Sequence, residues 1–383
     1  MKTSLKFTAL AALLFAAAGA MAQDMVVKIG SVGPTSGPIA HLGKDNENGV
    51  RLAIEDLNAK HVKIGGKTVK WEMVAQDDAG DPKQGTAVAQ LLVDQKVNGV
   101  IGHLNSGTTI PASKVYFDAG IPQISASATN PKFTRQGYNT AFRIVADDTQ
   151  LGGTLGRYAV NELKGKNIAV IDDRTAYGQG VADEFEKGAK GAGATIVGRE
   201  YTSDKATDFT PILTNIKGKK PDIIFFGGMD AVAGPMLRQM KQLGINAKYM
   251  GGDGICTVEL PKLTAGTIGD DQVYCAEASG IDPKDKAAVK EMDDFRARFK
   301  KRFGTEVQIY SPYTYDATML MAAAMEKADS AVPAKYLPVL AATRDYHGVT
   351  GTITFDKKGD IEHGALTLYT YRGGKKTMLD VIR

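Results

Sequence analysis

The sequence has few cysteines, almost no excess of charge and, beyond its first 22 residues, no long apolar run. Two cysteines in 383 residues exclude a disulfide-dense miniprotein, and they lack the spacing of a metal site. Its 47 basic and 43 acidic residues give a net charge of +4, which offers no broad basic surface for nucleic acid. The motifs GxGxxG, GxxxxGK(S/T), GxSxG and HExxH are absent, and the five histidines are scattered. We therefore expect no metal ion, no other cofactor and no nucleic-acid partner.

The composition that remains is that of an ordinary soluble globular protein. Hydrophobic residues make up 43% of the chain and charged residues 23%, so a disordered chain is excluded. A length of 383 residues suggests two domains or one large domain. The 43 glycines predict many tight turns and close approaches of the backbone.

Residues 1–22 have the pattern of an export signal. Lys2 and Lys6 precede an uninterrupted apolar run at 7–18, and small residues at 20 and 22 suit cleavage after Ala22. An uncleaved membrane anchor is the alternative, but the run is shorter than the roughly 20 residues that a span needs. No cysteine follows the cleavage site, which argues against a lipid anchor. We expect a free, soluble product outside the cytoplasm.

The two cysteines are expected to be bonded to each other, because an exported chain meets an oxidising compartment. Cys256 and Cys275 lie 19 positions apart, and closing such a loop stabilises by roughly 3 kcal/mol in the chain-entropy model. The alternative is two separate buried thiols.

Predicted strands and helices alternate in two successive blocks. Short apolar, β-branched runs predict strands, and apolar residues at helical spacing predict helices. Such alternation is typical of parallel sheets covered on both faces, so we expect two similar α/β lobes. In the first block we expect strands at 25–32, 69–75, 99–102 and 122–124, and helices at 50–57, 86–93 and 111–119. In the second we expect strands at 167–171, 195–201, 223–226 and 248–251, and helices at 150–163, 180–192, 209–216 and 233–243.

Polar and glycine-rich residues collect just after these strands, at 102–109, 125–129, 172–178, 227–230 and 252–254. Open α/β sheets bind ligands outside the carboxyl ends of their strands, so two such edges facing each other would form a ligand site. Residues 106–109 are also expected just before a helix, where hydroxyls and free N–H groups bind a small anion or simply cap the helix. Asp77, Asp78 and Asp81 lack the spacing of a calcium loop and are expected to form turns and caps.

Several motifs, in this order, resemble those of the periplasmic branched-chain amino-acid binding proteins, the type I solute-binding components of ATP-driven (ABC) importers. The resemblance extends from Val27 to about Lys375. The matching stretches are 33–38 (GPTSGP), 77–84 (DDAGDPKQ), 101–106 (IGHLNS), 111–113 (PAS), 127–129 (SAT), 135–138 (RQGY), 177–180 (YGQG), 249–254 (YMGGDG) and 354–360 (TFDKKGD).

The resemblance implies the type I periplasmic binding protein fold, in which two doubly wound α/β lobes are joined by three hinge strands. The ligand lies between the lobes, which close over it. Carried over to this chain, the crossings fall near 144–147, 275–277 and 350–354. Lobe one then comprises residues 24–146 with 277–351, and lobe two comprises 147–276 with 352–383.

The resemblance also implies how an amino acid would be held. Ser106 and Thr129 match positions that bind the α-carboxylate through hydroxyl and N–H groups. Ser127 matches a position whose carbonyl accepts from the α-ammonium. Asp253 stands where the family usually has a glutamate as counter-ion to that ammonium, and Tyr177 matches an aromatic residue that covers the ligand. A zwitterion leaving water needs both donors and a carboxylate acceptor, which agrees with this arrangement.

The pocket for the ligand side chain departs from the family pattern. Leu42 and Met229 stand where the family often has tyrosine, which keeps the pocket apolar and adaptable. Asn105 and Gly80 stand where some relatives carry a disulfide. The expected pocket residues are Leu42, Leu104, Asn105, Met229 and Tyr310.

The resemblance therefore predicts a monomeric periplasmic protein that captures leucine, isoleucine or valine and delivers it to the membrane permease of an ABC importer. Two alternatives stay open at this point. The same fold could bind another small solute, such as an amide, urea or an aromatic acid. An exported enzyme is the other, although no nucleophile and base pair is visible.

Overall fold

The computed structural model describes residues 25–278, 280–362 and 364–382. The predicted export signal at 1–22 and its cleavage after Ala22 lie outside these residues. No helix in the described ranges is both long enough and apolar enough to cross a membrane.

The first sheet is mainly parallel, with strand order β2-β3-β1-β4-β5-β6. Strand β1 lies inside it and pairs in parallel with both β3 and β4, whereas the short β2 is antiparallel to β3. Its strands are β1 (Met25–Gly33), β2 (Lys63–Ile64), β3 (Lys67–Asp77), β4 (Gly99–Ile101), β5 (Gln123–Ser125) and β6 (Ala141–Arg143).

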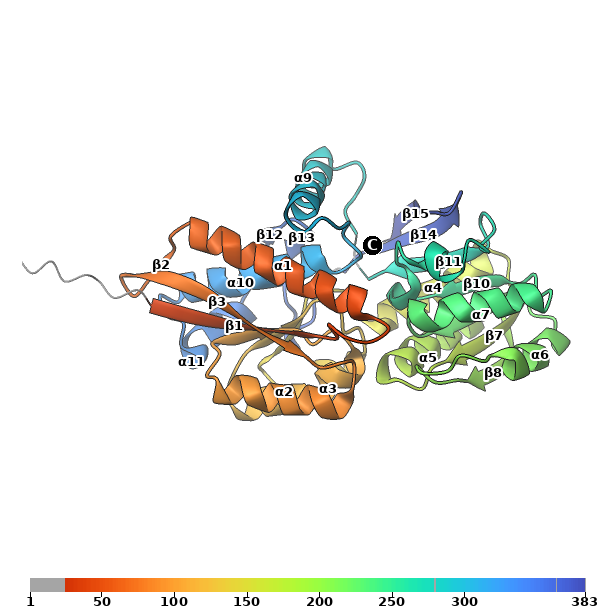
Figure 1. Ribbon diagram of the computed structural model, residues 1–383, viewed down its shortest axis with the longest axis horizontal. Coiled ribbons are helices and arrows are strands. Elements are labelled where there is room, and N and C mark those ends of the chain that lie inside the picture. Colours follow the sequence, from red (N-terminus) through yellow and green to blue (C-terminus); the bar gives the residue numbers. More distant parts are fainter. Residues whose placement is uncertain (1–24, 279, 363, 383) are drawn as a thin grey trace, which may run out of the picture.

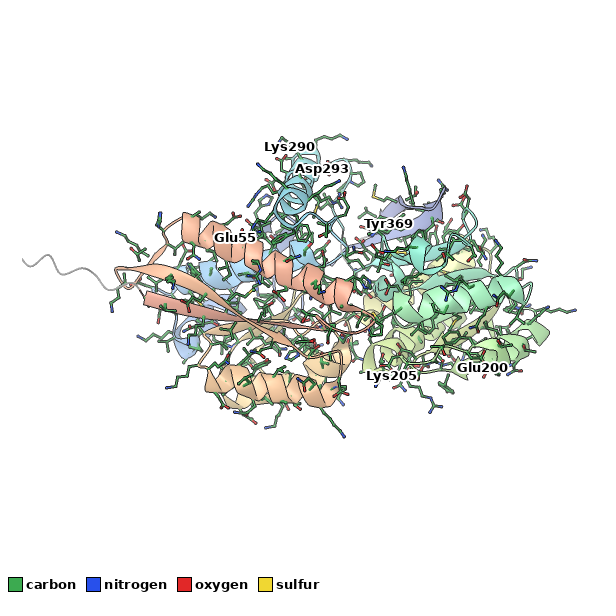
Figure 2. All side chains as sticks on the ribbon, in the orientation of Figure 1. Glu55, Glu200, Lys205, Lys290, Asp293 and Tyr369 are labelled. Atoms are coloured by element: carbon green, nitrogen blue, oxygen red, sulfur yellow. A yellow bond between two sulfur atoms is a disulfide. The ribbon has the colours of Figure 1, made fainter. Side chains whose placement is uncertain are left out.

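Helices cover both faces of this sheet (Figure 1). On one face, Val50, Ile54 and Leu57 of α1 join a core with Val27 and Ile29 of β1. Polar side chains of the same helix, such as Glu55, point away from the sheet (Figure 2). On the other face, apolar residues of α2 and α3 form a separate core. The helices of this unit are α1 (Ala40–Ala59), α2 (Pro82–Asp94), α3 (Ser106–Asp118), α10 (Ser311–Lys327) and α11 (Pro333–Ala341), with the short turn η1 (Pro131–Phe133) and the hairpin of β12 (Tyr346–Gly348) and β13 (Gly351–Ile353). Helix α9 (Lys286–Phe303) packs outside them, on α1 and α10.

The second sheet has the order β15-β14-β11-β10-β9-β7-β8. It is parallel from β11 to β8, and β14 and β15 add an antiparallel pair at one edge. Its strands are β7 (Asn167–Asp172), β8 (Thr195–Tyr201), β9 (Ile223–Gly227), β10 (Lys248–Gly251), β11 (Val273–Glu277), β14 (Leu366–Arg372) and β15 (Lys375–Ile382).

Strand β7 shows why this sheet is covered on both faces. Ile168 and Val170 point into one core, and the alternate residues Ala169 and Ile171 point into another. A strand buried on both faces needs an apolar run, which residues 168–171 of β7 provide. The surrounding helices are α4 (Asp148–Asn161), α5 (Ala176–Gly191), α6 (Thr210–Gly218), α7 (Asp230–Gln242), α8 (Leu260–Leu263) and the short turn η2 (Asp253–Ile255).

The chain passes between the two sheets three times. The first passage, at 144–147, joins β6 to α4. The second, at 278–285, leaves β11 for α9, and the third, at 354–365, joins β13 to β14. Residues 275–277 therefore lie within β11 of the second sheet rather than in the connecting segment. Two α/β units with three connections are the architecture that the motifs implied.

Two helices begin earlier than their sequence patterns suggested because a side chain caps the first turn. The carboxylate of Asp81 accepts from the N–H groups of Lys83 and Gln84, so α2 starts at Pro82. The hydroxyl of Thr175 accepts from the N–H of Gly178, so α5 starts at Ala176.

Residues 106–109 are likewise the first turn of α3 and do not precede it. The prediction had taken Pro111 as the helix start, whereas this proline lies inside the helix. Further along the chain, no local pattern had indicated helices α8 to α11 or the strands after β10.

Cys256 and Cys275 form a disulfide with their Cα atoms 5.4 Å apart, which confirms the predicted pairing. The bond fastens the segment after η2 to strand β11, and both residues are fully buried. It therefore fixes the loop that follows Asp253 against the second sheet.

Candidate functional site

The edge of the first sheet contributes three buried hydroxyl side chains. Ser106 opens α3 and accepts a hydrogen bond from the N–H of Asn130 at 3.2 Å. Ser127 donates to the carbonyl of Leu104 at 3.0 Å. The hydroxyl of Thr129 forms no hydrogen bond with any residue that the structure describes. This edge therefore holds hydroxyl groups with bonding capacity to spare.

The second sheet contributes a carboxylate that is held in place by hydrogen bonds. Asp253 follows β10 and is buried. The hydroxyl of Tyr177 donates to its Oδ1 at 2.8 Å and accepts from the N–H of Gly254 at 3.0 Å. Burial raises the pKa of Asp253 to about 6, although the tyrosine hydrogen bonds favour its charged form. The side chain is thus ionised in most molecules at pH 7.

Tyr310 connects the two sheets at this carboxylate. It lies just before α10, which packs on α1 beside the first sheet, and its hydroxyl donates to Oδ2 of Asp253 at 2.8 Å. The backbone around Tyr310 is fixed by Asp45 of α1. The carboxylate of Asp45 accepts from four consecutive N–H groups, at Gln308, Ile309, Tyr310 and Ser311.

An apolar cluster lies beside this junction. Leu42, Leu104, Ile309 and Tyr310 form it, and Met229 packs against it from the second sheet. The structure thus brings together four of the five residues expected to line a side-chain pocket. Ile309 was not expected, although its place next to Tyr310 in the sequence could have indicated it.

Asn105 completes the set of expected pocket residues. It precedes α3 but does not cap it with its side chain, and its Oδ1 forms no hydrogen bond with the described residues. A Cβ placed on Gly80 would lie 3.6 Å from that oxygen. The two positions that the resemblance linked to a disulfide are therefore neighbours here.

Two glycines allow the second-sheet residues to approach each other. A Cβ on Gly252 would lie 2.6 Å from the hydroxyl oxygen of Tyr177, closer than the atoms can pack. A Cβ on Gly254 would lie 2.8 Å from the sulfur of Met229. The glycines at 252 and 254 are thus required for Tyr177, Asp253 and Met229 to converge.

A second polar contact joins the two sheets outside this cluster. His41 of α1 contacts Asp230 of α7, with Nε2 and Oδ2 2.8 Å apart, and the hydroxyl of Thr257 donates to the same oxygen. Sequence reasoning missed this pair, because nothing local connects positions 41 and 230.

The residues in the described ranges contain no group of three or more histidines, cysteines or acids placed to hold a metal ion. His103, which lies in a matching motif, is buried between Asp78 and Tyr116, with a ring nitrogen 2.8 Å from Asp78 and the other 3.0 Å from the tyrosine hydroxyl. It therefore has a structural role.

The sequence profile of the family described as "Periplasmic binding protein" matches residues 26–375. The chain belongs to this family. Membership confirms the fold and the resemblance drawn from the motifs. It makes the protein an extracytoplasmic solute-binding protein and not an enzyme.

Individual relatives cover nearly the whole chain. A Leu/Ile/Val-binding protein homolog of Brucella abortus is 35% identical over 377 residues, which are 97% of each chain. An amino acid binding protein of Pseudomonas aeruginosa is 38% identical and covers 90% of each. The solved structure of a branched-chain amino acid transporter substrate binding protein from Streptococcus pneumoniae, in complex with isoleucine, is 27% identical with a TM-score of 0.83. That match covers 93% of this chain and 99% of the other.

Proposed function

We propose that the protein captures leucine, isoleucine or valine between two closing lobes, and delivers it to the membrane permease of an ABC importer. Lobe one comprises residues 24–146 and 278–361, and lobe two comprises 147–277 and 364–383, because Glu277 pairs with Thr367 in the second sheet whereas Asp360 pairs with Arg143 in the first. The exported protein is a monomer in the periplasm after cleavage behind Ala22.

The observation that carries this proposal is the position of Asp253. Its buried carboxylate lies where the two sheets meet and is oriented by one tyrosine from each side. Ser106 and Thr129 supply donors from the opposite sheet edge. An α-amino acid has an ammonium that pairs with the carboxylate and a carboxylate that accepts from the hydroxyls. Both of its charges are thereby compensated when it leaves water.

The side chain of the ligand is proposed to meet the apolar cluster. Leu42, Leu104 and Met229 offer only carbon and sulfur surface, with Tyr310 beside them. Branched aliphatic side chains of different shape suit such a pocket, because methionine adapts readily. The names of three relatives all include leucine: one names leucine, isoleucine and valine, one adds threonine and alanine, and one names leucine alone.

A ligand screen with matched analogues tests the proposal. Leucine at 100 times its Kd should stabilise the protein against unfolding by about 2.7 kcal/mol. 4-Methylpentanoate lacks only the ammonium of leucine, and 3-methylbutylamine lacks only the carboxylate. Each should bind far more weakly, because one buried partner is left uncompensated. Binding of an amide, urea or an aromatic acid without any binding of amino acids would overturn the proposal.

A further inference from the structure

Asp148 is a buried acid that the proposed site does not yet use. It is the first residue of α4, and its backbone N–H donates to the carbonyl of Thr129 at 2.8 Å. The side chain is fully buried, and neither of its oxygens forms a hydrogen bond with the residues that the structure describes. The hydroxyl of the adjacent Thr129 is also without a hydrogen bond.

This lack of partners is exceptional among the buried carboxylates of the described residues, since only Asp148 has both oxygens unbonded. Asp45 accepts from four backbone N–H groups, and Asp316 accepts from Val349 and Thr350. A buried polar group without a partner costs stability, so each such group in a native protein needs a reason for its presence. The surroundings of Asp148 indicate what that reason is.

Asp148 lies where the two lobes meet. A Cβ on Gly180 of α5 would lie 2.7 Å from its Oδ2 and 2.6 Å from Nδ2 of Asn130. That amide in turn donates to the carbonyl of Ala176 at 2.7 Å. The carboxyl group is therefore enclosed between the segment after β5 and helix α5, beside Thr129.

The two acids at this junction have opposite environments. Asp253 receives two tyrosine hydroxyls, which stabilise its negative charge. Among the described residues, Asp148 has only the Thr129 hydroxyl close to it, and that hydroxyl lies outside hydrogen-bonding geometry. Burial raises the pKa of Asp148 well above its ordinary value, and the charges of Asp253 and Asp147 act in the same direction. The Thr129 hydroxyl and the Arg143 guanidinium oppose this change but do not cancel it. When two neighbouring acids differ in this way, one carries the charge and the other carries the proton.

We propose that Asp148 is a further ligand-binding residue, which as a neutral carboxylic acid donates a hydrogen bond to the carboxylate of the bound amino acid beside Thr129. This inference rests on the proposed function. It leaves the site with one negative side chain, Asp253, to balance the single ammonium of the ligand. The ligand carboxylate then meets neutral donors only.

Three variants measured by calorimetry with leucine test the role. Asp148→Asn keeps a neutral donor of the same shape, so its affinity should stay within a few-fold of the parent. Asp148→Ala removes the donor and should weaken binding roughly 10- to 150-fold, since a hydrogen bond to a charged group contributes about 1.5–3 kcal/mol. Asp253→Asn is the matched comparison, because there the same change removes a charge and should weaken binding strongly.

The dependence of affinity on pH gives an independent readout. The ligand binds the protonated form of Asp148, so the affinity of the parent should fall as pH rises through the pKa of this residue. Asp148→Asn cannot lose its donor and should lack that decline. The other groups that face Asp148, namely Arg143, Asp147, Asp253 and Tyr177, are unchanged in this variant.

The outcomes separate this inference from the proposed function. If the parent binds leucine and Asp148→Asn loses as much affinity as Asp253→Asn, then Asp148 is an ionised acceptor and the inference is wrong. It is also wrong if a folded Asp148→Ala, checked by its melting curve, binds as tightly as the parent. Should Asp148→Ala fail to fold, the affinity and pH profile of Asp148→Asn decide the matter. A parent that binds no amino acid overturns the proposed function itself.

Discussion

The substitution Asp253→Asn should separate an amino-acid binder from a binder of uncharged solutes. It keeps the shape of a fully buried side chain that two tyrosine hydroxyls contact at 2.8 Å each, and it removes the charge. Losing one partner of a buried charge pair typically costs about 2–5 kcal/mol, because the other charge is left unpaired. The affinity for leucine should therefore fall by roughly 30-fold to several thousand-fold, at about 1.4 kcal/mol per tenfold.

The pH dependence of the parent adds a second measurement. The ligand ammonium pairs only with the ionised form of Asp253, and burial raises the pKa of this residue to about 6. Acidification below that value protonates the carboxyl group and must weaken binding, by about tenfold at pH 5 relative to pH 7 if this group acts alone. The Asn variant has no such proton to gain, so this decline on the acid side should be absent.

Isothermal calorimetry of the parent and the variant, each with leucine and with 4-methylpentanoate, provides the assay. The analogue has no ammonium to leave unpaired, so the substitution should change its binding little or even improve it. The reasoning is refuted if leucine binds the Asn variant as tightly as it binds the parent protein.

Three other results are expected. Thiol titration of denatured, unreduced protein from the periplasm should find no free thiol, and two free thiols would contradict the bond. Replacing Cys256 and Cys275 by serine should lower the free energy of unfolding by roughly 3 kcal/mol. Burial lowers the pKa of His41, but the hydrogen bond to Asp230 and the negative charge of Asp230 outweigh it and raise this pKa overall. The charged pair of His41 and Asp230 should therefore hold the lobes together best at acid pH. The affinity ratio of the parent to His41→Gln should then be largest below that pKa and shrink as pH rises, and a ratio independent of pH would refute the role. Small-angle scattering should give a smaller radius of gyration with leucine, and an unchanged radius would count against closure of an open form.

The inner strands of the two sheets could be predicted from the sequence because they are buried on both faces. Strand β7 is apolar along nearly its whole length, and β10 was predicted at the bounds that the structure gives it. The half-buried edge strand β8 was also predicted at its bounds. The first residue of a helix was less predictable where a capping side chain starts the helix before its apolar residues begin. Thr175 and Asp81 start α5 and α2 before any apolar spacing appears. Turn chemistry, not periodicity, decides such positions.

The convergence of the site from distant segments could not be read from the residues alone. Nothing in the local sequence connects Tyr310 with Asp253, or His41 with Asp230, because these contacts depend on how the lobes meet. The family motifs led to Asp253 and Tyr177, whose positions they share. They gave no reason to single out Asp148, whose importance lies in the partners that it lacks.

Asp45 explains how the fold can couple lobe closure to the charge of the ligand. Its buried carboxylate fixes the backbone of residues 308–311 through four N–H groups, so Tyr310 is held by α1 before any ligand is present. Tyr310 and Asp253 come from different sheets and are in contact here, so in the proposed movement Tyr310 would reach Asp253 as the second sheet approaches the first. Closure therefore brings a donor to the carboxylate at the same time as it encloses the ligand. Because a hydrogen bond from tyrosine favours the ionised form of Asp253, the closed state prepares the charge that an ammonium requires. A ligand without an ammonium gains nothing from that charge, so under the proposed function the closing movement would itself favour amino acids.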